Sequence, residues 1–213
     1  MRLFSKNLAA AFVGAVAFVA LSAASHASTI SIFSTGVDGS GNVVGGADQH
    51  YTATGGAPTT PYYNVAYVAN DAGSQWIGGD PFSPNFTAVD YTVHFTLAEA
   101  ANAILSGSWG IDNQGLDILV NGNSLGISLL GVVVENFNQL HSFTTTLAQS
   151  AFFHVGDNTL TFRIQNDGGP GAFRTAGLSV AATPIPPSIL LFLTAIGGMG
   201  FVAYRRRGAA LAA

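Results

Sequence analysis

Residues 91–97 alternate without exception between apolar and polar side chains, with Tyr91, Val93, Phe95 and Leu97 in the apolar positions. Side chains two residues apart share one face of a β-strand, so this pattern predicts a strand with one buried face and one solvated face. Similar short runs, separated by clusters of Gly, Asn, Asp and Pro, predict further strands. They lie at 29–33, 62–68, 104–109, 116–120, 124–130, 142–147, 159–165 and 177–181.

Helical patterning is scarce. Apolar residues at helical spacing occur only at 98–105 and 147–153, and each segment favours a single turn of helix or the start of a strand. Asn121-Gly122 lies between two predicted strands, and these residue types readily take the positive φ angles of a tight hairpin. Residues 36–56 are glycine-rich and unpatterned, which indicates a surface loop that is partly disordered unless a ligand fastens it. Short strands without long helices predict an all-β fold, built as a two-sheet sandwich.

The N-terminal segment has the features of a secretory signal peptide. Two basic residues precede an apolar run at 8–21, and Ser25 and Ala27 place small residues three and one before a cut. We predict a signal helix at 1–27 that is removed between Ala27 and Ser28. The alternative is a retained N-terminal anchor.

The C-terminal segment 184–213 begins with a proline-rich motif and continues as an uncharged apolar run at 189–204. A helix of that run reaches about 24 Å, against a hydrocarbon core of about 30 Å. We predict a short C-terminal transmembrane helix whose arginine cluster lies on the cytoplasmic side, so that domain 28–183 is exported. The cluster consists of Arg205, Arg206 and Arg207.

The proline motif consists of Pro184, Ile185, Pro186, Pro187 and Ser188. Together with the apolar run and the arginines, it resembles the PEP-CTERM sorting signals of Gram-negative bacteria, in a variant similar to Pro-Leu-Pro-Ala, because the usual Pro-Glu-Pro is absent. This resemblance implies that an exosortase, a membrane transpeptidase, processes the motif. It also implies a transient inner-membrane anchor followed by delivery to the cell surface or the exopolysaccharide matrix. An ordinary C-terminal membrane anchor is the alternative.

The charge of the exported part differs from that of the whole chain. Only Arg163 and Arg174 remain between residues 28 and 183, against all eleven acidic residues, which gives a net charge of −9. Such a surface repels nucleic acid and attracts cations. The chain has no cysteine, so disulfides and thiol chemistry are excluded.

Several short segments of the middle region resemble galactose-binding-like jelly-roll domains. They are FSTGVD at 33–38, DQHY at 48–51, QWI at 75–77, GSWGIDN at 107–113, VNG at 120–122 and GDNTLTF at 156–162. The resemblance implies a jelly-roll form of the sandwich. Because the family includes carbohydrate-binding modules as well as appendages without enzymatic activity, it implies no particular ligand.

Both tryptophans are candidates for a sugar-binding platform. Trp109 precedes Asp112 and Asn113, and Trp76 has polar neighbours as well. An exposed ring flanked by such residues can stack on the CH groups of a sugar while the polar side chains meet its hydroxyls. We therefore predict glycan binding at these residues. The alternative is that both rings belong to the core.

Asp38, Ser40 and Asn42 place oxygen atoms at alternate positions of a glycine-rich turn, as the first half of a calcium loop does. The full EF-hand pattern fails because Val43 occupies the glycine position and Gln49 the position of the bidentate glutamate. We predict a calcium site here, with a plain turn as the alternative.

The sequence lacks a recognisable catalytic motif. Its exported histidines are not paired at metal-ligand spacing, and Glu99 and Glu135 are its only glutamates. The histidines are His50, His94, His141 and His154. We therefore predict a non-catalytic surface or exopolysaccharide-matrix protein with a carbohydrate-binding sandwich. The alternatives are a purely structural matrix protein and, from a third class, a secreted glycan-cleaving hydrolase.

Overall fold

The computed structural model describes residues 27–183 together with residues 194 and 196. The proline motif, the arginine cluster and the predicted signal helix up to residue 26 lie outside the described residues, so the predictions for them remain open. Among the residues that the structure describes, no helix is both long enough and apolar enough to cross a membrane. The folded part is one compact unit, Ser28–Ala182.

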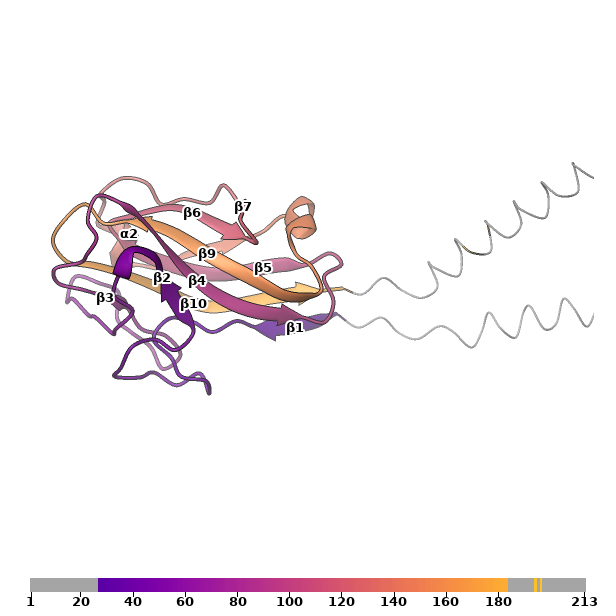
Figure 1. Cartoon of the computed structure of the whole chain (residues 1–213), viewed down its shortest axis with the longest axis horizontal. Helices are drawn as coiled ribbons and strands as arrows, with labels where there is room; N and C mark the ends of the chain where they lie inside the picture. Colours follow the sequence, from indigo (N-terminus) through magenta and orange to yellow (C-terminus); the bar gives the residue numbers. More distant parts are fainter. Residues whose placement is uncertain (1–26, 184–193, 195, 197–213) are drawn as a thin grey trace, which may run out of the picture. The chain divides into compact units, whose positions relative to one another are not determined.

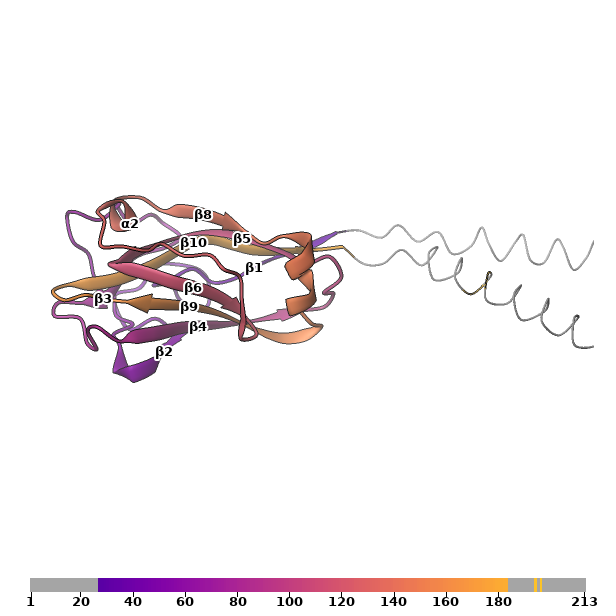
Figure 2. The ribbon, with the colours of Figure 1, turned by 90° about the horizontal axis from the view of Figure 1, so that it is seen from above.

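Two five-stranded antiparallel sheets form this unit. The first, here named the β10 sheet, contains β1 (Ser28–Ser31), β10 (Gly171–Ala182), β5 (Ile104–Asp112) and β8 (His141–Thr144) in that order, with β3 (Ile77–Gly79) beside β10 (Figure 1). The second, named the β9 sheet, contains β2 (Tyr51–Ala53), β4 (Ala88–Leu97), β9 (Gly156–Gln165), β6 (Gln114–Val120) and β7 (Asn123–Ser124). Figure 2 shows the sheets as two layers, which confirms the predicted all-β sandwich.

Helical structure in the unit is limited to three short elements. They are η1 (Thr54–Gly56), α2 (Glu135–Asn138) and η2 (Leu147–Phe152). The element η2 coincides with the second segment for which a helical turn was one of the two predicted outcomes. The 98–105 segment instead ends in β5, which is the other outcome that the sequence allows.

The core lies between the sheets, and aromatic rings from three strands meet there. The ring of Phe173 lies with its centroid 5.0 Å from that of Tyr91 and 5.0 Å from that of Phe162. Tyr91 belongs to the alternating strand β4, whose apolar side chains from Val89 to Leu97 are all buried, as the pattern predicts. The buried side chains of both hydrophobic clusters come from within Ser28–Ala182, so we expect this unit to fold when it is produced alone.

Some of the local predictions are confirmed and others are wrong. The hairpin at Asn121-Gly122 is confirmed, because it joins β6 to β7 with φ angles of 50° and 79°. The predicted strand at 62–68 is wrong: this segment is a loop in which Tyr67 packs against Trp76 with ring centroids 4.8 Å apart. The run 124–130 contributes only β7 and an isolated bridge from Leu129 to the sheet.

Candidate functional site

The structure contradicts the prediction that the tryptophans form sugar platforms. Trp109 is 1% exposed and Trp76 is fully buried. Trp109 lies so close over Gly115 that a Cβ atom on that glycine would be 2.3 Å from the ring. The missing side chain of Gly115 makes room for the indole ring. Because Trp109 is almost fully buried, both faces of its ring are covered by protein and neither is open to a sugar.

The polar neighbours of Trp109 join loops together. Asp112 is 6% exposed and accepts hydrogen bonds from the Tyr67 hydroxyl at 2.8 Å and from the Asn113 side-chain nitrogen at 2.6 Å. Burial raises the pKa of Asp112, and the hydrogen bond from Tyr67 opposes this shift. The Asn113 side-chain oxygen accepts from the backbone nitrogen of Asp167 at 2.8 Å. Their role in the structure is therefore to fix the loops at the ends of β5 and β9.

The three residues of the predicted calcium site lie in one turn. The Oδ1 atom of Asp38 accepts hydrogen bonds from the backbone nitrogens of Ser40 at 2.8 Å and Asn42 at 3.0 Å. These bonds, the one from Asn42 first, lower the pKa of Asp38. Among the described residues no group of three or more His, Cys, Asp or Glu side chains could hold a metal ion. Calcium binding by this turn stays a prediction.

A cavity of about 340 Å³ opens beside the same turn. Its lining includes Ser31, Phe33, Ser34, Ser40 and Gly73. Phe33 follows β1 directly and is 36% exposed, and its ring stacks on that of His50 with centroids 3.6 Å apart and planes 4° apart. One face of the ring is therefore covered by protein, and Phe33 is also among the residues that line the cavity.

Hydroxyl groups supply the polar part of the lining. Within the described residues, the side-chain hydroxyls of Ser31, Ser34 and Ser40 form no hydrogen bond with the protein. A serine hydroxyl can donate one hydrogen bond and accept two. The cavity thus offers a ligand several uncommitted donors and acceptors next to an aromatic ring.

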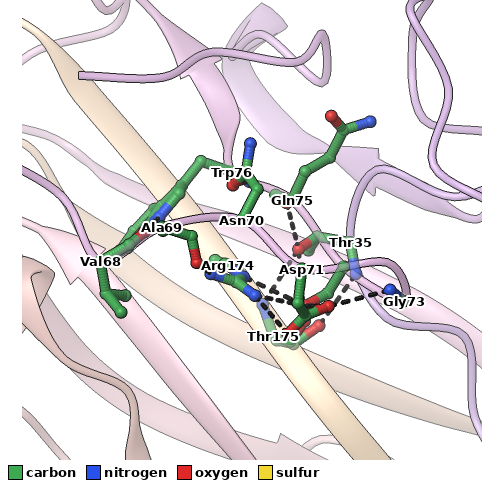
Figure 3. Close-up of polar contacts among 11 residues, drawn as sticks. Thr35, Val68, Ala69, Asn70, Asp71, Gly73, Gln75, Trp76, Arg174 and Thr175 are labelled. Atoms are coloured by element: carbon green, nitrogen blue, oxygen red, sulfur yellow. Dashed lines mark hydrogen bonds and ion pairs between the residues drawn. The ribbon is translucent and has the colours of Figure 1, made fainter. Parts of the chain in front are cut away.

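A buried arginine holds one wall of the cavity in place (Figure 3). Arg174 of β10 is 1% exposed, and its guanidinium donates to the Ala69 carbonyl at 2.5 Å, to Asp71 Oδ2 at 2.6 Å and to Ser74 Oγ at 2.8 Å. Asp71 in turn accepts from the backbone nitrogen of Gly73 at 2.9 Å. The segment that contains Gly73 is therefore fixed to β10.

Thr35 ties the opposite wall to the same strand. Its hydroxyl donates to the Gln75 carbonyl at 2.8 Å and accepts from the backbone nitrogen of Thr175 at 3.0 Å. Since Thr35 follows Phe33 and Ser34 closely in the chain, these bonds fix the position of the residues that line the cavity. Both walls are thus anchored on Arg174 and Thr175, which are neighbours in β10.

The glycine-rich loop after Phe33 is fastened by protein groups rather than by a ligand. Asp48 is 8% exposed, and its carboxylate accepts from the backbone nitrogens of Gly36, His50 and Tyr51. The Gln75 side-chain nitrogen donates to the carbonyl oxygens of Gly36 and Val44. The prediction of partial disorder in this region assumed that such internal partners were absent, and the structure supplies them.

The charges around the cavity disfavour an anionic ligand. No basic residue is among those that line it. The two arginines of the unit are already paired, Arg163 with Asp90 at 2.8 Å and Arg174 with Asp71 at 2.6 Å. A ligand that enters the cavity therefore meets an aromatic ring, hydroxyls and backbone groups, but no free cationic side chain among the described lining residues.

The site was only partly visible in the sequence. Ser31, Phe33 and Ser34 are close neighbours in the chain, so an aromatic residue flanked by serines was a usable signal. The contribution of Gly73 was not, because that residue reaches the cavity only through the contacts of Arg174 with the 69–74 segment.

Comparisons with known proteins identify no family for this chain. No protein-family model matches the chain, and no curated protein matches it either. Among solved structures, it is similar to the enzymatically active domain of tailspike protein 4 from bacteriophage CBA120, with 13% identity, a TM-score of 0.33, and coverage of 76% of this chain and 20% of that one. It is also similar to the GH26-CBM35 β-(1,4)-mannanase of Podospora anserina, with 11% identity, a TM-score of 0.30, and coverage of 75% and 28%. The chain thus spans less than a third of the length of these structures.

Proposed function

We propose that this chain is a non-catalytic, glycan-binding protein of the cell surface or exopolysaccharide matrix, and that it holds a sugar in the cavity beside Phe33. One observation carries the proposal: the residues that line the cavity include the partly exposed Phe33 and three serines whose hydroxyls have no partner among the described residues. Sugars present CH groups that stack on aromatic rings and hydroxyls that exchange hydrogen bonds with such groups. The volume of about 340 Å³ lies at the lower end of ligand pockets, which span about 300–1,000 Å³.

The electrostatics favour a neutral sugar. The exported part carries two basic and eleven acidic residues, so a uronic acid, a sulfate ester or a phosphate would approach against the field of the domain. A neutral hexose or N-acetylhexosamine meets no such repulsion. We therefore propose a neutral monosaccharide unit, at the end or in a side branch of a glycan, as the ligand of the cavity.

The placement of the carboxylates supports a binding role without catalysis. Most aspartates of the unit accept hydrogen bonds from protein groups; these are Asp38, Asp48, Asp71, Asp90, Asp112, Asp117, Asp157 and Asp167. Glycoside hydrolysis needs two carboxyl groups about 5–10 Å apart on either side of the scissile bond. No acidic residue is among those that line the cavity.

Delivery to the surface is proposed from the targeting segments. The signal peptide is cut between Ala27 and Ser28, the tail holds the chain in the inner membrane, and an exosortase-like transpeptidase acts within 184–188. Mass spectrometry of the mature protein tests this step. We expect an N-terminus at Ser28 and a C-terminus within 184–188. A mature chain that still ends at Ala213 would contradict the cut in the tail and would indicate a permanently anchored protein.

Binding is tested on residues 28–183 with a panel of glucose, galactose, mannose and N-acetylglucosamine, by calorimetry with and without calcium. We expect Phe33→Ala and Ser34→Ala each to weaken binding about tenfold, which corresponds to about 1.4 kcal/mol. Leu147→Ala is the matched control, because Leu147 is an exposed apolar residue of η2 and does not line the cavity. The affinity of the Leu147→Ala variant for the sugars should equal that of the native domain.

The outcomes separate the three classes of function. Binding that depends on Phe33 supports the proposal. If no sugar of the panel binds, the glycan-binding role is refuted and a purely structural matrix protein remains. The release of reducing ends from a polysaccharide would identify a hydrolase.

A further inference from the structure

A second aromatic ring is exposed on a different part of the sandwich. Phe86 lies two residues before β4, and it is 70% exposed, about twice the exposed fraction of Phe33. It is also one of the few residues other than glycine with a positive φ angle, at 56°. A large apolar side chain is thus held outside the core in a backbone conformation that disfavours it by about 1–2 kcal/mol. Such conformations persist where surrounding contacts impose them, and they concentrate at binding sites.

The contacts that hold Phe86 are visible in the structure. Its backbone nitrogen donates to the carbonyl of Asn166 at 2.7 Å. Its ring lies beside Gly168, where a Cβ atom would be 3.4 Å from the ring. The loop between β9 and β10 therefore contacts the ring and leaves most of it open to solvent.

Amide and carboxylate side chains come from Asn85, the chain neighbour of Phe86, and from the 165–167 segment that bonds to its backbone. Asn166 is fully buried, and its side chain lies 2.6 Å from the side-chain oxygen of Asn85, the neighbour of Phe86. The carboxylate of Asp167 accepts hydrogen bonds from the side-chain nitrogens of Gln165 at 2.7 Å and of Gln114. Asn85 is held by the buried Asn166, whereas Gln165 and Asp167 bond to each other. All three residues are partly exposed, so their side chains can still bond to a ligand.

We infer that Phe86 and its polar neighbours form a second glycan-binding surface, so that one copy of the protein holds two glycan segments at once. Here this surface is called the Phe86 platform and consists of Asn85, Phe86, Gln165 and Asp167. The inference rests on the proposed function and extends it from binding to cross-linking. A ring that is 70% exposed has no enclosing wall, which suits an internal stretch of a neutral polysaccharide, whereas the cavity suits a single sugar unit.

The two sites are separate in sequence and in the fold. The cavity is built on the segment that follows β1 of the β10 sheet, and the platform precedes β4 of the β9 sheet. They share no residue. Both are carried by one closely packed unit, and we expect a glycan bound at one site to leave the other free. Two such sites on a rigid body convert a weak binder into a bridge between chains of a matrix.

A bridging assay tests the inference. Residues 28–183 are added to beads coated with galactomannan or dextran, and the capture of the same polysaccharide in fluorescent, soluble form is measured. We expect the native domain to bridge, and Phe86→Ala to lower capture at least tenfold while the affinity for free monosaccharide changes less than twofold. Phe86→Asn is the second variant, because asparagine tolerates a positive φ angle and removes the ring without adding backbone strain. Val155→Ala, at a residue that is 63% exposed outside both sites, is the control and should bridge as the native domain does.

The possible failures are distinguishable. If the native domain binds monosaccharide but does not bridge, or if Phe86→Ala and Phe86→Asn bridge normally, the platform is refuted and the proposed function stands. If the native domain binds neither monosaccharide nor polysaccharide, the proposed function fails and the platform fails with it. Thermal unfolding of each variant shows that a lost signal does not come from a lost fold.

Discussion

Ser28 and Ala182 are direct partners in the antiparallel pair of β1 and β10. The Cα atoms of such partners lie about 4.5–5.5 Å apart, so the first and last residues of the folded unit are neighbours. The leader and the tail therefore join the sandwich at adjacent points of one sheet. Neither of the two proposed cuts requires the folded unit to open.

This adjacency predicts that the unit tolerates circular permutation. Joining Ala182 to Ser28 through about four Gly and Ser residues, and opening the chain after Gly122 in the exposed hairpin, should leave the sandwich intact. We expect a loss of at most about 1–2 kcal/mol of unfolding free energy in urea. A permuted chain opened after Gly177, within β10, is the control and should not fold. If neither permuted chain folds, the pairing of Ser28 with Ala182 does not define the folded unit.

The ion pair of Arg174 with Asp71 should matter more than that of Arg163 with Asp90. Burial lowers the pKa of Arg174, and Asp71 opposes this shift, so Asp71→Ala leaves a buried guanidinium with only neutral partners. We expect Asp71→Ala to lower the free energy of unfolding by about 1.5–3 kcal/mol. Asp90→Ala breaks a pair whose arginine side chain is 44% exposed, and should cost about 0–1 kcal/mol. Equal losses in urea unfolding would contradict the structural role of Arg174.

Two glycines with similar backbone angles should respond differently to alanine. Gly36 has a φ angle of 72° and Gly41 one of 80°, so each substitution incurs the cost of a left-handed backbone. A Cβ atom at Gly36 would lie 2.1 Å from Cγ of Gln75, whereas one at Gly41 meets nothing within 4 Å. We expect Gly36→Ala to lose about 1–3 kcal/mol more than Gly41→Ala. Thermal unfolding of the pair checks this, and similar losses would mean that Gln75 can move aside.

The pH dependence of stability should carry the signature of Asp112. Burial raises the pKa of Asp112 above the ordinary value of 3.8. The folded state then binds the proton more tightly, so this group stabilises the fold at low pH and the contribution is lost as pH rises through the folded pKa. Asp112→Asn stays neutral, and its stability relative to the native domain should increase from about pH 4 towards neutrality. Urea unfolding across that range measures the difference.

Asp38 provides the opposite case as a control. Backbone hydrogen bonds from Asn42 and Ser40 lower the pKa of Asp38, so its contribution is present above the ordinary value and is lost as pH falls through the folded pKa. Asp38→Asn should therefore lose stability relative to the native domain as pH rises from below that value. If both variants followed the same trend, the assignment of the two shifts would be wrong.

Local patterns predicted the fold better than the site. The alternation of β4 and the turn at Asn121-Gly122 are confirmed because each depends on neighbouring residues alone. The strand at 62–68 fails because Tyr67 packs on Trp76 and donates a hydrogen bond to Asp112, which is 45 residues away in the chain.

The burial of Trp109 could not be predicted for a similar reason. Its neighbours Asp112 and Asn113 have the composition of a sugar site, but the space for the indole ring is created by Gly115. Phe86 was missed because its exposure depends on the support of Asn166 and Gly168, some eighty residues away. The sequence indicated the kind of chemistry, an aromatic ring with polar neighbours, and the fold decided which rings remain accessible.

The position of β10 has a consequence for chains that end early. It is the last strand to be synthesised, and yet it lies between β1 and β5 and supplies Phe173 to the core. A chain that ends prematurely, or that is clipped before Gly171, lacks the strand on which its sheet is assembled. We therefore expect only chains that contain β10 to fold and to resist proteolysis, whether or not residues 184–213 follow.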